Sequence, residues 1–116
     1  MRPRRAVSTI DRLRKICLAF PEAEEQVSHG HPVFFVRKKC FAALEPKGSR
    51  EAIAVRIDPL DADIFTDDAR FFLTPYGRGK WISLWADGKI DWNLVKQLVE
   101  QSYRIVAPKR AILRRP

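Results

Sequence analysis

Four β-strand-like segments follow one another between residues 27 and 57, and helical patterns flank this run on both sides. We predict the strands at residues 27–29, 33–36, 40–45 and 53–57, with a loop at 22–25 and a turn at 46–49. In the fourth segment, Ile53, Val55 and Ile57 alternate with Ala52, Ala54 and Arg56, which predicts one wetter face. Strands bounded by helices indicate an α+β fold with an antiparallel sheet and helices packed on one face.

The N-terminal helical pattern begins at a capping-box-like sequence, in which Asp11 stands three residues after Ser8. Apolar residues then follow at spacings of 3, 4 and 3, which predicts one amphipathic helix. These residues are Ile10, Leu13, Cys17 and Phe20. Pro21 is expected to end the helix, because proline interrupts helical hydrogen bonding.

The second half of the chain predicts a short helix, two more strands and a long helix. Asp58 caps the short helix, with Leu60 and Ile64 on its buried side, and the strands lie at 71–73 and 81–86. Asp91 caps the last helix, which Pro108 stops, and Trp92 is expected in its core face. We therefore predict a two-layer sandwich: an antiparallel sheet of five or six strands with the N- and C-terminal helices on one face. The expected core includes Phe34, Val55, Leu84 and Leu98.

The length of 116 residues is that of one domain, so we assign residues 1–116 to a single unit. No stretch approaches the roughly 20 apolar residues that span a bilayer, and no signal peptide is evident. Cys17 and Cys40 are far apart in apolar settings, which indicates core residues in a reducing compartment. We expect a cytoplasmic protein with no membrane contact.

The net charge of +8 is concentrated at the two ends of the chain. Residues 1–15 hold six basic residues and one acidic residue, and residues 101–116 hold five basic residues and no acidic one. The stretch between them has 11 basic and 13 acidic residues. If the ends meet in the fold, they form one positive patch suited to phosphates; if they do not, they are two solubilising arms. We expect flexible basic ends at about 1–7 and 111–116.

Four groups of residues, in a fixed order, carry a family resemblance. They are Ser28-His29-Gly30-His31-Pro32 with Phe34; Lys39-Cys40-Phe41-Ala42; Thr74-Pro75-Tyr76-Gly77 with Gly79-Lys80-Trp81; and Asp91-Trp92 leading to Ser102-Tyr103-Arg104 and Pro108-Lys109-Arg110. Together they resemble the MmcQ/YjbR family of small bacterial proteins, from about residue 10 to residue 110. One departure is His29, where the family pattern usually has Trp.

The resemblance implies a CyaY-like, frataxin-like two-layer fold and a DNA-binding role, and it brings no catalytic residues. Frataxins bind iron through an acidic ridge on the first helix. Arg12, Arg14 and Lys15 stand in that helix here, so iron binding is not carried over.

Candidate chemical groups are few. His29 and His31 would share a face of a strand and could hold a metal ion, or His31 could simply pack before Pro32. Lys39 could lower the pKa of Cys40, but no general base accompanies either cysteine. Asp67-Asp68 is typical of a solvated helix end. We therefore expect no enzyme activity, no metal and no cofactor.

The loop at residues 76–81 is the most site-like segment, because its glycines permit close approach and its cations can meet phosphate. With the basic turn at 37–39 and the basic ends, it predicts weak DNA binding without sequence preference. The predicted nucleic-acid-binding residues are Arg4, Arg5, Arg37, Lys38, Lys39, Arg78, Lys80, Lys109, Arg110 and Arg114. The alternative is a protein-interaction or chaperone-like adaptor that docks through the apolar segment 111–113.

Overall fold

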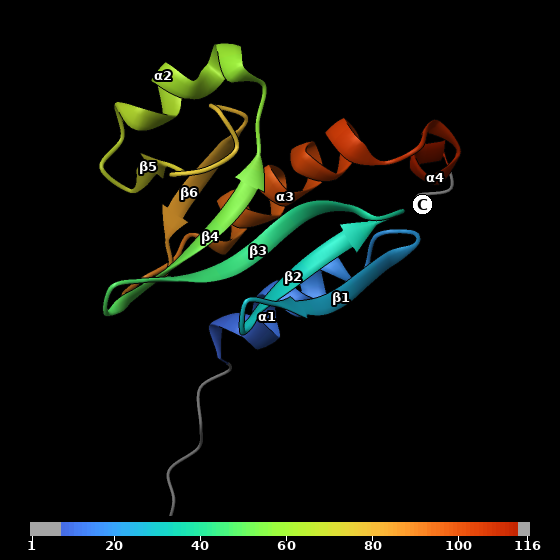
Figure 1. Ribbon diagram of the computed structural model, residues 1–116, viewed down its shortest axis with the longest axis horizontal. Helices are drawn as coiled ribbons and strands as arrows, with labels where there is room; N and C mark the ends of the chain where they lie inside the picture. Colours follow the sequence, from blue (N-terminus) through green and yellow to red (C-terminus); the bar gives the residue numbers. More distant parts are fainter. Residues whose placement is uncertain (1–7, 114–116) are drawn as a thin grey trace, which may run out of the picture.

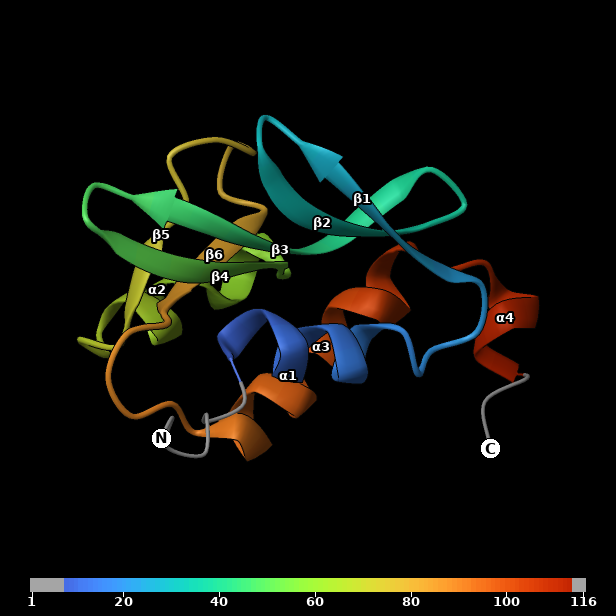
Figure 2. The same ribbon diagram turned by 90° about the horizontal axis from the view of Figure 1, so that it is seen from below.

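The computed structural model describes residues 8–113, with side chains placed as far as Ala111. Six antiparallel strands form one open sheet in the order β1-β2-β3-β4-β6-β5, and α1 and α3 lie side by side on one of its faces (Figures 1 and 2). The elements are α1 (Thr9–Cys17), β1 (Ala23–Ser28), β2 (His31–Val36), β3 (Lys39–Lys47), β4 (Arg50–Arg56), the 3-10 helix η1 (Pro59–Asp61), α2 (Ala62–Thr66), β5 (Phe71–Leu73), β6 (Trp81–Trp85), α3 (Trp92–Val106) and α4 (Lys109–Leu113). This architecture confirms the predicted α+β fold.

The first helix begins as predicted and ends earlier. The Ser8 hydroxyl accepts a hydrogen bond from the Asp11 amide at 3.2 Å, which caps α1. The helix ends at Cys17, so Pro21 lies in the connection to β1 and does not itself terminate the helix. Leu13 and Cys17 are fully buried beneath it.

The expected loop at residues 22–25 is largely strand, and that prediction was wrong. β1 begins at Ala23 and pairs with β2 over its whole length, from Ala23 opposite Val36 to Ser28 opposite His31. The sequence of β1 is polar because β1 is an edge strand whose residues are half-buried or exposed. A hydrophobicity pattern therefore does not reveal it as a strand.

The main core lies between the sheet and the two long helices. Phe34, Val55, Leu84 and Leu98 all belong to it, as predicted. Tyr103 of α3 is fully buried, and its ring lies 4.7 Å from that of Phe20 and 5.4 Å from that of Phe41. These aromatic contacts, together with the aliphatic residues, hold α3 against β3 and the α1–β1 connection.

Ser102 fastens α3 to the middle of the sheet. Its hydroxyl donates a 2.5 Å hydrogen bond to the carbonyl of Phe41 in β3 and accepts a 2.8 Å bond from the amide of Arg56 in β4. Because the side chain is fully buried, both bonds form without competition from water. One hydroxyl thereby links a helix to two neighbouring strands.

The outer face of the sheet, away from α1 and α3, is less exposed than predicted. Ala52 and Ala54, expected on a wetter face, are 2% and 0% exposed. Val33, Ala43 and Trp81 form a second apolar cluster around Ala54. The prediction was wrong because alanine is small enough for larger neighbouring side chains to cover it.

The loop between β5 and β6 folds against Trp81. Gly77 has a φ of 85°, and a side-chain carbon there would overlap the Trp81 indole. Glycine at position 77 therefore permits both the backbone conformation and the close contact with Trp81. Where the loop begins, the Thr74 hydroxyl shares a buried 2.8 Å hydrogen bond with the hydroxyl of Ser83 in β6.

The short helical segment formed by η1 and α2 is oriented differently from the prediction. Asp58 caps it through the Leu60 amide at 3.0 Å, as expected. Leu60 and Ile64, however, are 88% and 70% exposed, so the predicted buried side was wrong. Phe65 anchors the segment instead, with its ring 5.1 Å from that of Phe71.

The C-terminal part contains one helix that the sequence did not predict. Asp91 caps α3 through the Leu94 amide at 3.2 Å, and α3 ends at Val106, before Pro108. Residues 109–113 then form α4, where we expected a flexible end from residue 111, and Ala111 is fully buried. Within residues 8–113, no helix combines the length and apolar character needed to cross a bilayer.

Candidate functional site

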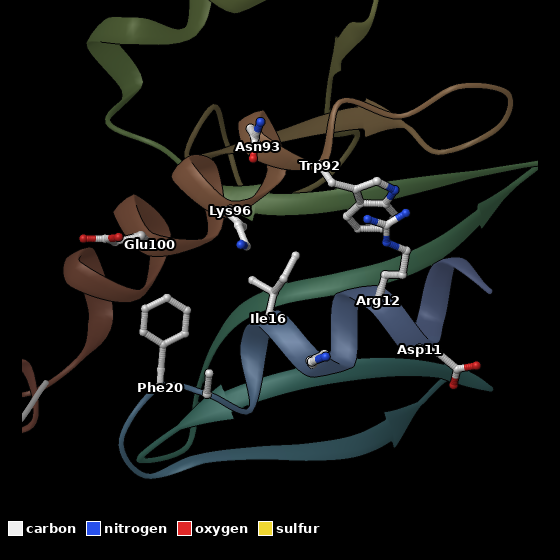
Figure 3. A pocket seen from close by; sticks show the side chains of 10 residues that line it. Asp11, Arg12, Ile16, Phe20, Trp92, Asn93, Lys96 and Glu100 are labelled. Atoms are coloured by element: carbon white, nitrogen blue, oxygen red, sulfur yellow. The ribbon is translucent and has the colours of Figure 1, made fainter. Parts of the chain in front are cut away.

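A groove of about 810 Å³ runs between α1 and α3 on the surface that faces away from the sheet (Figure 3). Ile16 and Phe20 from α1 and the residues after it, and Trp92 from the start of α3, supply its apolar surface. Three cations, Arg12, Lys15 and Lys96, come from both helices. The groove exists because each helix turns its apolar stripe toward the sheet and leaves its polar face outside.

Most acidic side chains near the groove are already paired. Asp11 forms a 3.0 Å ion pair with Arg14, which also holds Glu25 of β1 at 2.6 Å. The hydrogen bond from Arg14 lowers the pKa of Glu25. At the other end, Glu100 pairs with Arg104 at 3.4 Å. The groove carboxylates are thus engaged by arginines whose side chains do not line it.

The three groove cations have no acidic partner among the described residues. Arg12 lies over the Trp92 ring, 4.9 Å from its centroid, which orients the guanidinium across the mouth of the groove (Figure 3). Figure 3 also shows Lys96 reaching from α3 into the space between the helices. Trp92, expected in the core, is only partly buried and borders the groove.

The predicted nucleic-acid-binding residues do not form one surface. The β2–β3 turn with Arg37 and Lys38, and the start of β3 with Lys39, lie at the same end of the molecule as α4 with Lys109 and Arg110 (Figures 1 and 2). All five of these side chains are exposed. In that turn, Arg37 is paired with Glu22 at 2.5 Å. This end therefore offers four cations that have no acidic partner among the described residues: Lys38, Lys39, Lys109 and Arg110.

Arg78 and Lys80 lie elsewhere, in the loop between β5 and β6. This loop covers the ends of β4 and β6, away from the β2–β3 turn (Figure 1). Arg4, Arg5 and Arg114 lie outside the described residues. α1 begins at a distance from α4, so the described parts of the two basic ends do not meet (Figure 2).

Arg12, Lys15 and Lys96 were not among the binding residues predicted from the sequence. A partial signal was present, because Arg12 and Lys15 are three residues apart and fall opposite the apolar stripe of α1. Lys96 could not be added from the sequence, since its place depends on how α1 and α3 pack together.

A second hollow, of about 340 Å³, lies on the outer face of the sheet. At its edge the Tyr76 hydroxyl donates a hydrogen bond to Glu45, and His31 Nε2 lies 3.4 Å from the same carboxylate oxygen. Burial, followed by the bond to Glu45, raises the pKa of Tyr76. His29, in the β1–β2 turn, also borders this hollow. Two of the sequence groups that carried the family resemblance, the one with His29 and His31 and the one with Pro75 and Tyr76, thus meet here.

Neither cysteine has the environment of a nucleophile. Burial raises the pKa of Cys17 well above its ordinary value and also raises that of Cys40. The predicted lowering of the Cys40 pKa by Lys39 was therefore wrong, because Lys39 is exposed and desolvation dominates. Within the described residues, no three His, Cys, Asp or Glu side chains gather closely enough to hold a metal ion.

An open six-stranded antiparallel sheet with two helices across one face defines a small α+β protein with a cationic helical groove. The family model for YjbR matches residues 18–105, and the chain belongs to this family, which confirms the resemblance drawn from its residues. No curated protein matches the sequence.

The fold is similar to that of several solved structures, among them the following two. One is a Deinococcus radiodurans protein with a DUF419 domain, which has 20% sequence identity and a TM-score of 0.74. That match covers 88% of this chain and 80% of the other. The second is a Pseudomonas syringae protein with 14% identity and a TM-score of 0.61, over 72% of this chain and 86% of the other. At these identities the likeness concerns the fold alone.

Proposed function

We propose that this protein is a non-enzymatic DNA-binding module that holds the phosphate backbone weakly and without sequence preference in the groove between α1 and α3. The observation that supports this most is the set of three cations in the groove, Arg12, Lys15 and Lys96, which have no acidic partner among the described residues. Cations free of internal partners can neutralise phosphates and release counterions.

The sequence before α1 is also basic. Arg2, Arg4 and Arg5 precede α1, the helix that supplies Arg12 and Lys15. These three residues add positive charge to the N-terminal part of the chain. In the groove itself, the exposed part of Trp92 adds an aromatic surface beside Arg12. Contacts of this kind position a duplex without reading its bases.

The test is a salt titration of duplex DNA binding by fluorescence anisotropy, with a groove variant, R12Q/K15Q/K96Q. The matched control, K38Q/K39Q/K80Q, removes the same charge from exposed loops. We expect the intact protein to bind with a dissociation constant of roughly 10⁻⁴–10⁻⁶ M at physiological salt. The groove variant should bind more weakly, with a salt slope flatter by up to about 2.7, at about 0.9 per phosphate contact.

The control should keep most of the affinity and slope of the intact protein. Equal losses in both variants would mean that net charge alone matters, and the groove proposal would fail. A larger loss in the control would favour the loop residues predicted from the sequence. Trimming residues 1–5 should weaken binding further, whereas a C-terminal trim should start at residue 114, because Ala111 is buried within α4.

A further inference from the structure

The η1–α2 segment presents an apolar surface that the rest of the chain does not cover. Leu60 and Ile64 are 88% and 70% exposed, although both belong to a helical segment whose opposite side is anchored by Phe65 against Phe71. Two large aliphatic side chains, four residues apart on one short segment, make a contiguous surface of the kind that marks a contact with another molecule. We call Leu60, Ile64 and the aspartates around them the α2 patch.

The α2 patch is acidic, in contrast with the protein as a whole. Four exposed aspartates flank Leu60 and Ile64, and none of them forms an ion pair within the described part of the chain. They are Asp58, Asp61, Asp63 and Asp67. The next aspartate, Asp68, is engaged by Arg70 at 2.7 Å. The patch therefore fits a partner segment that is basic and contains aliphatic residues.

The C-terminal segment of this same chain has that composition. Residues 109–116 contain four basic residues, no acidic residue, and the adjacent aliphatic pair Ile112-Leu113. Lys109 and Arg110 are exposed on α4. Four cations in this segment thus match four aspartates in the patch.

Within one molecule, α4 lies away from the α2 patch. Figure 1 shows α2 and α4 along the same long side of the molecule but at its opposite ends, and Figure 2 shows the same separation. A two-fold axis that lies beside that long side and runs along the viewing direction of Figure 1 brings α4 of one copy next to α2 of the other. Each copy then places its C-terminal segment over the α2 patch of the other, and the contact closes as a symmetric dimer.

We infer that the α2 patch is a self-association surface, which receives the basic C-terminal segment of a second copy of this chain in a reciprocal dimer. This role is separate from the DNA-binding groove, which α1 and α3 form on another part of the surface. Two small contacts of this type give weak association, with a dissociation constant on the order of micromolar or above. Because the contact depends partly on electrostatic attraction, which salt screens, the dimer is less stable at high salt.

Sedimentation velocity over a concentration series, without DNA, tests the inference. The patch variant is L60S/I64S, which changes two exposed side chains. The tail variant changes the four cations of the C-terminal segment 109–116 and is K109Q/R110Q/R114Q/R115Q. We expect the intact protein to dimerise at low salt and each variant to remain monomeric. V27S is the matched control, because Val27 is 75% exposed on β1, away from the patch. The V27S protein should dimerise as the intact protein does.

Mixing the two variants gives the sharpest result. The patch variant keeps an intact tail and the tail variant keeps an intact patch, so only the mixture can form one of the two contacts. A heterodimer weaker than the native dimer is expected in the mixture alone. The inference is overturned if the intact protein stays monomeric at its highest soluble concentration, if either variant dimerises normally, or if the mixture does not associate. Melting curves establish that every variant is folded.

Discussion

The hydroxyl of Tyr103 donates a 2.8 Å hydrogen bond to the carbonyl of Pro21, a residue 82 positions earlier in the chain. Pro21 lies between α1 and β1, and Tyr103 lies in the last turns of α3. This single bond therefore joins α3 to the connection between the first helix and the sheet.

Replacing Tyr103 with Phe should lower the free energy of unfolding by about 1 kcal/mol, because the carbonyl of Pro21 loses its donor while the ring packing is retained. Urea unfolding should show a lower midpoint with an unchanged slope. Tyr76→Phe is the matched comparison, since Tyr76 is 44% exposed, and it should have a smaller effect. If the two variants lose the same stability, the bond from Tyr103 to Pro21 contributes no more than the bond of the more exposed Tyr76.

Gly77→Ala and Gly79→Ala should differ in their cost. Both glycines have positive φ values, 85° and 81°, so both alanines are strained by about 1 kcal/mol. Only at position 77 would the new methyl group overlap Trp81, whereas the space beside Gly79 is open. We expect Gly77→Ala to cost at least twice as much in urea unfolding. Equal losses would show that the loop moves away from Trp81 without penalty.

The Asp68 carboxylate should titrate at unusually low pH. Hydrogen bonds from the side chain and the amide of Arg70 lower its pKa from 3.8 to about 2. Because the folded-state pKa is depressed, the stabilisation is complete above about pH 4 and is lost as the pH falls toward 2. An NMR titration of the Asp68 carboxyl should show this midpoint. In Arg70→Gln it should move partway back toward 3.8, since the amide bond remains; an unchanged midpoint contradicts the assignment.

Both thiols should be slow to react at neutral pH. Burial raises the pKa of Cys17 and of Cys40, so each is protonated at pH 7 and a poor nucleophile. Alkylation of the folded protein should be slow at Cys40, accelerate above pH 9, and reach Cys17 only on unfolding, as mass spectrometry can follow. Cys40→Ser identifies which thiol is labelled. Rapid labelling of Cys40 at pH 7 would contradict this expectation.

The order of the elements and most of the core could be predicted because they depend on local signals. Ser8, Asp58 and Asp91 cap the helical segments where the sequence placed them. The periodic apolar residues of α1 and α3 then determine which helix faces meet the sheet. These signals can be recognised in the sequence because a helix cap or a periodic apolar stripe involves residues only a few positions apart.

The errors arose where distant partners decide the outcome. β1 is polar and becomes a strand because β2 pairs with it and Arg14 holds its Glu25. In the η1–α2 segment, the apolar spacing fitted Leu60 and Ile64 as well as it fitted Phe65, and only the position of Phe71 separates the alternatives. For the same reason the groove was missed, since it requires two helices from opposite ends of the sequence to lie side by side.

Because of the hydrogen bond to Ser102, the backbone amide of Arg56 reports on the contact between α3 and the sheet. The N–H of Arg56 belongs to a β-strand, yet its acceptor is a helix side chain and not a neighbouring strand. Hydrogen exchange at this amide is therefore governed by separation of α3 from the sheet, whereas its neighbours in β4 report on disruption of strand pairing. The difference in protection between them measures how independently the helical layer can lift from the sheet.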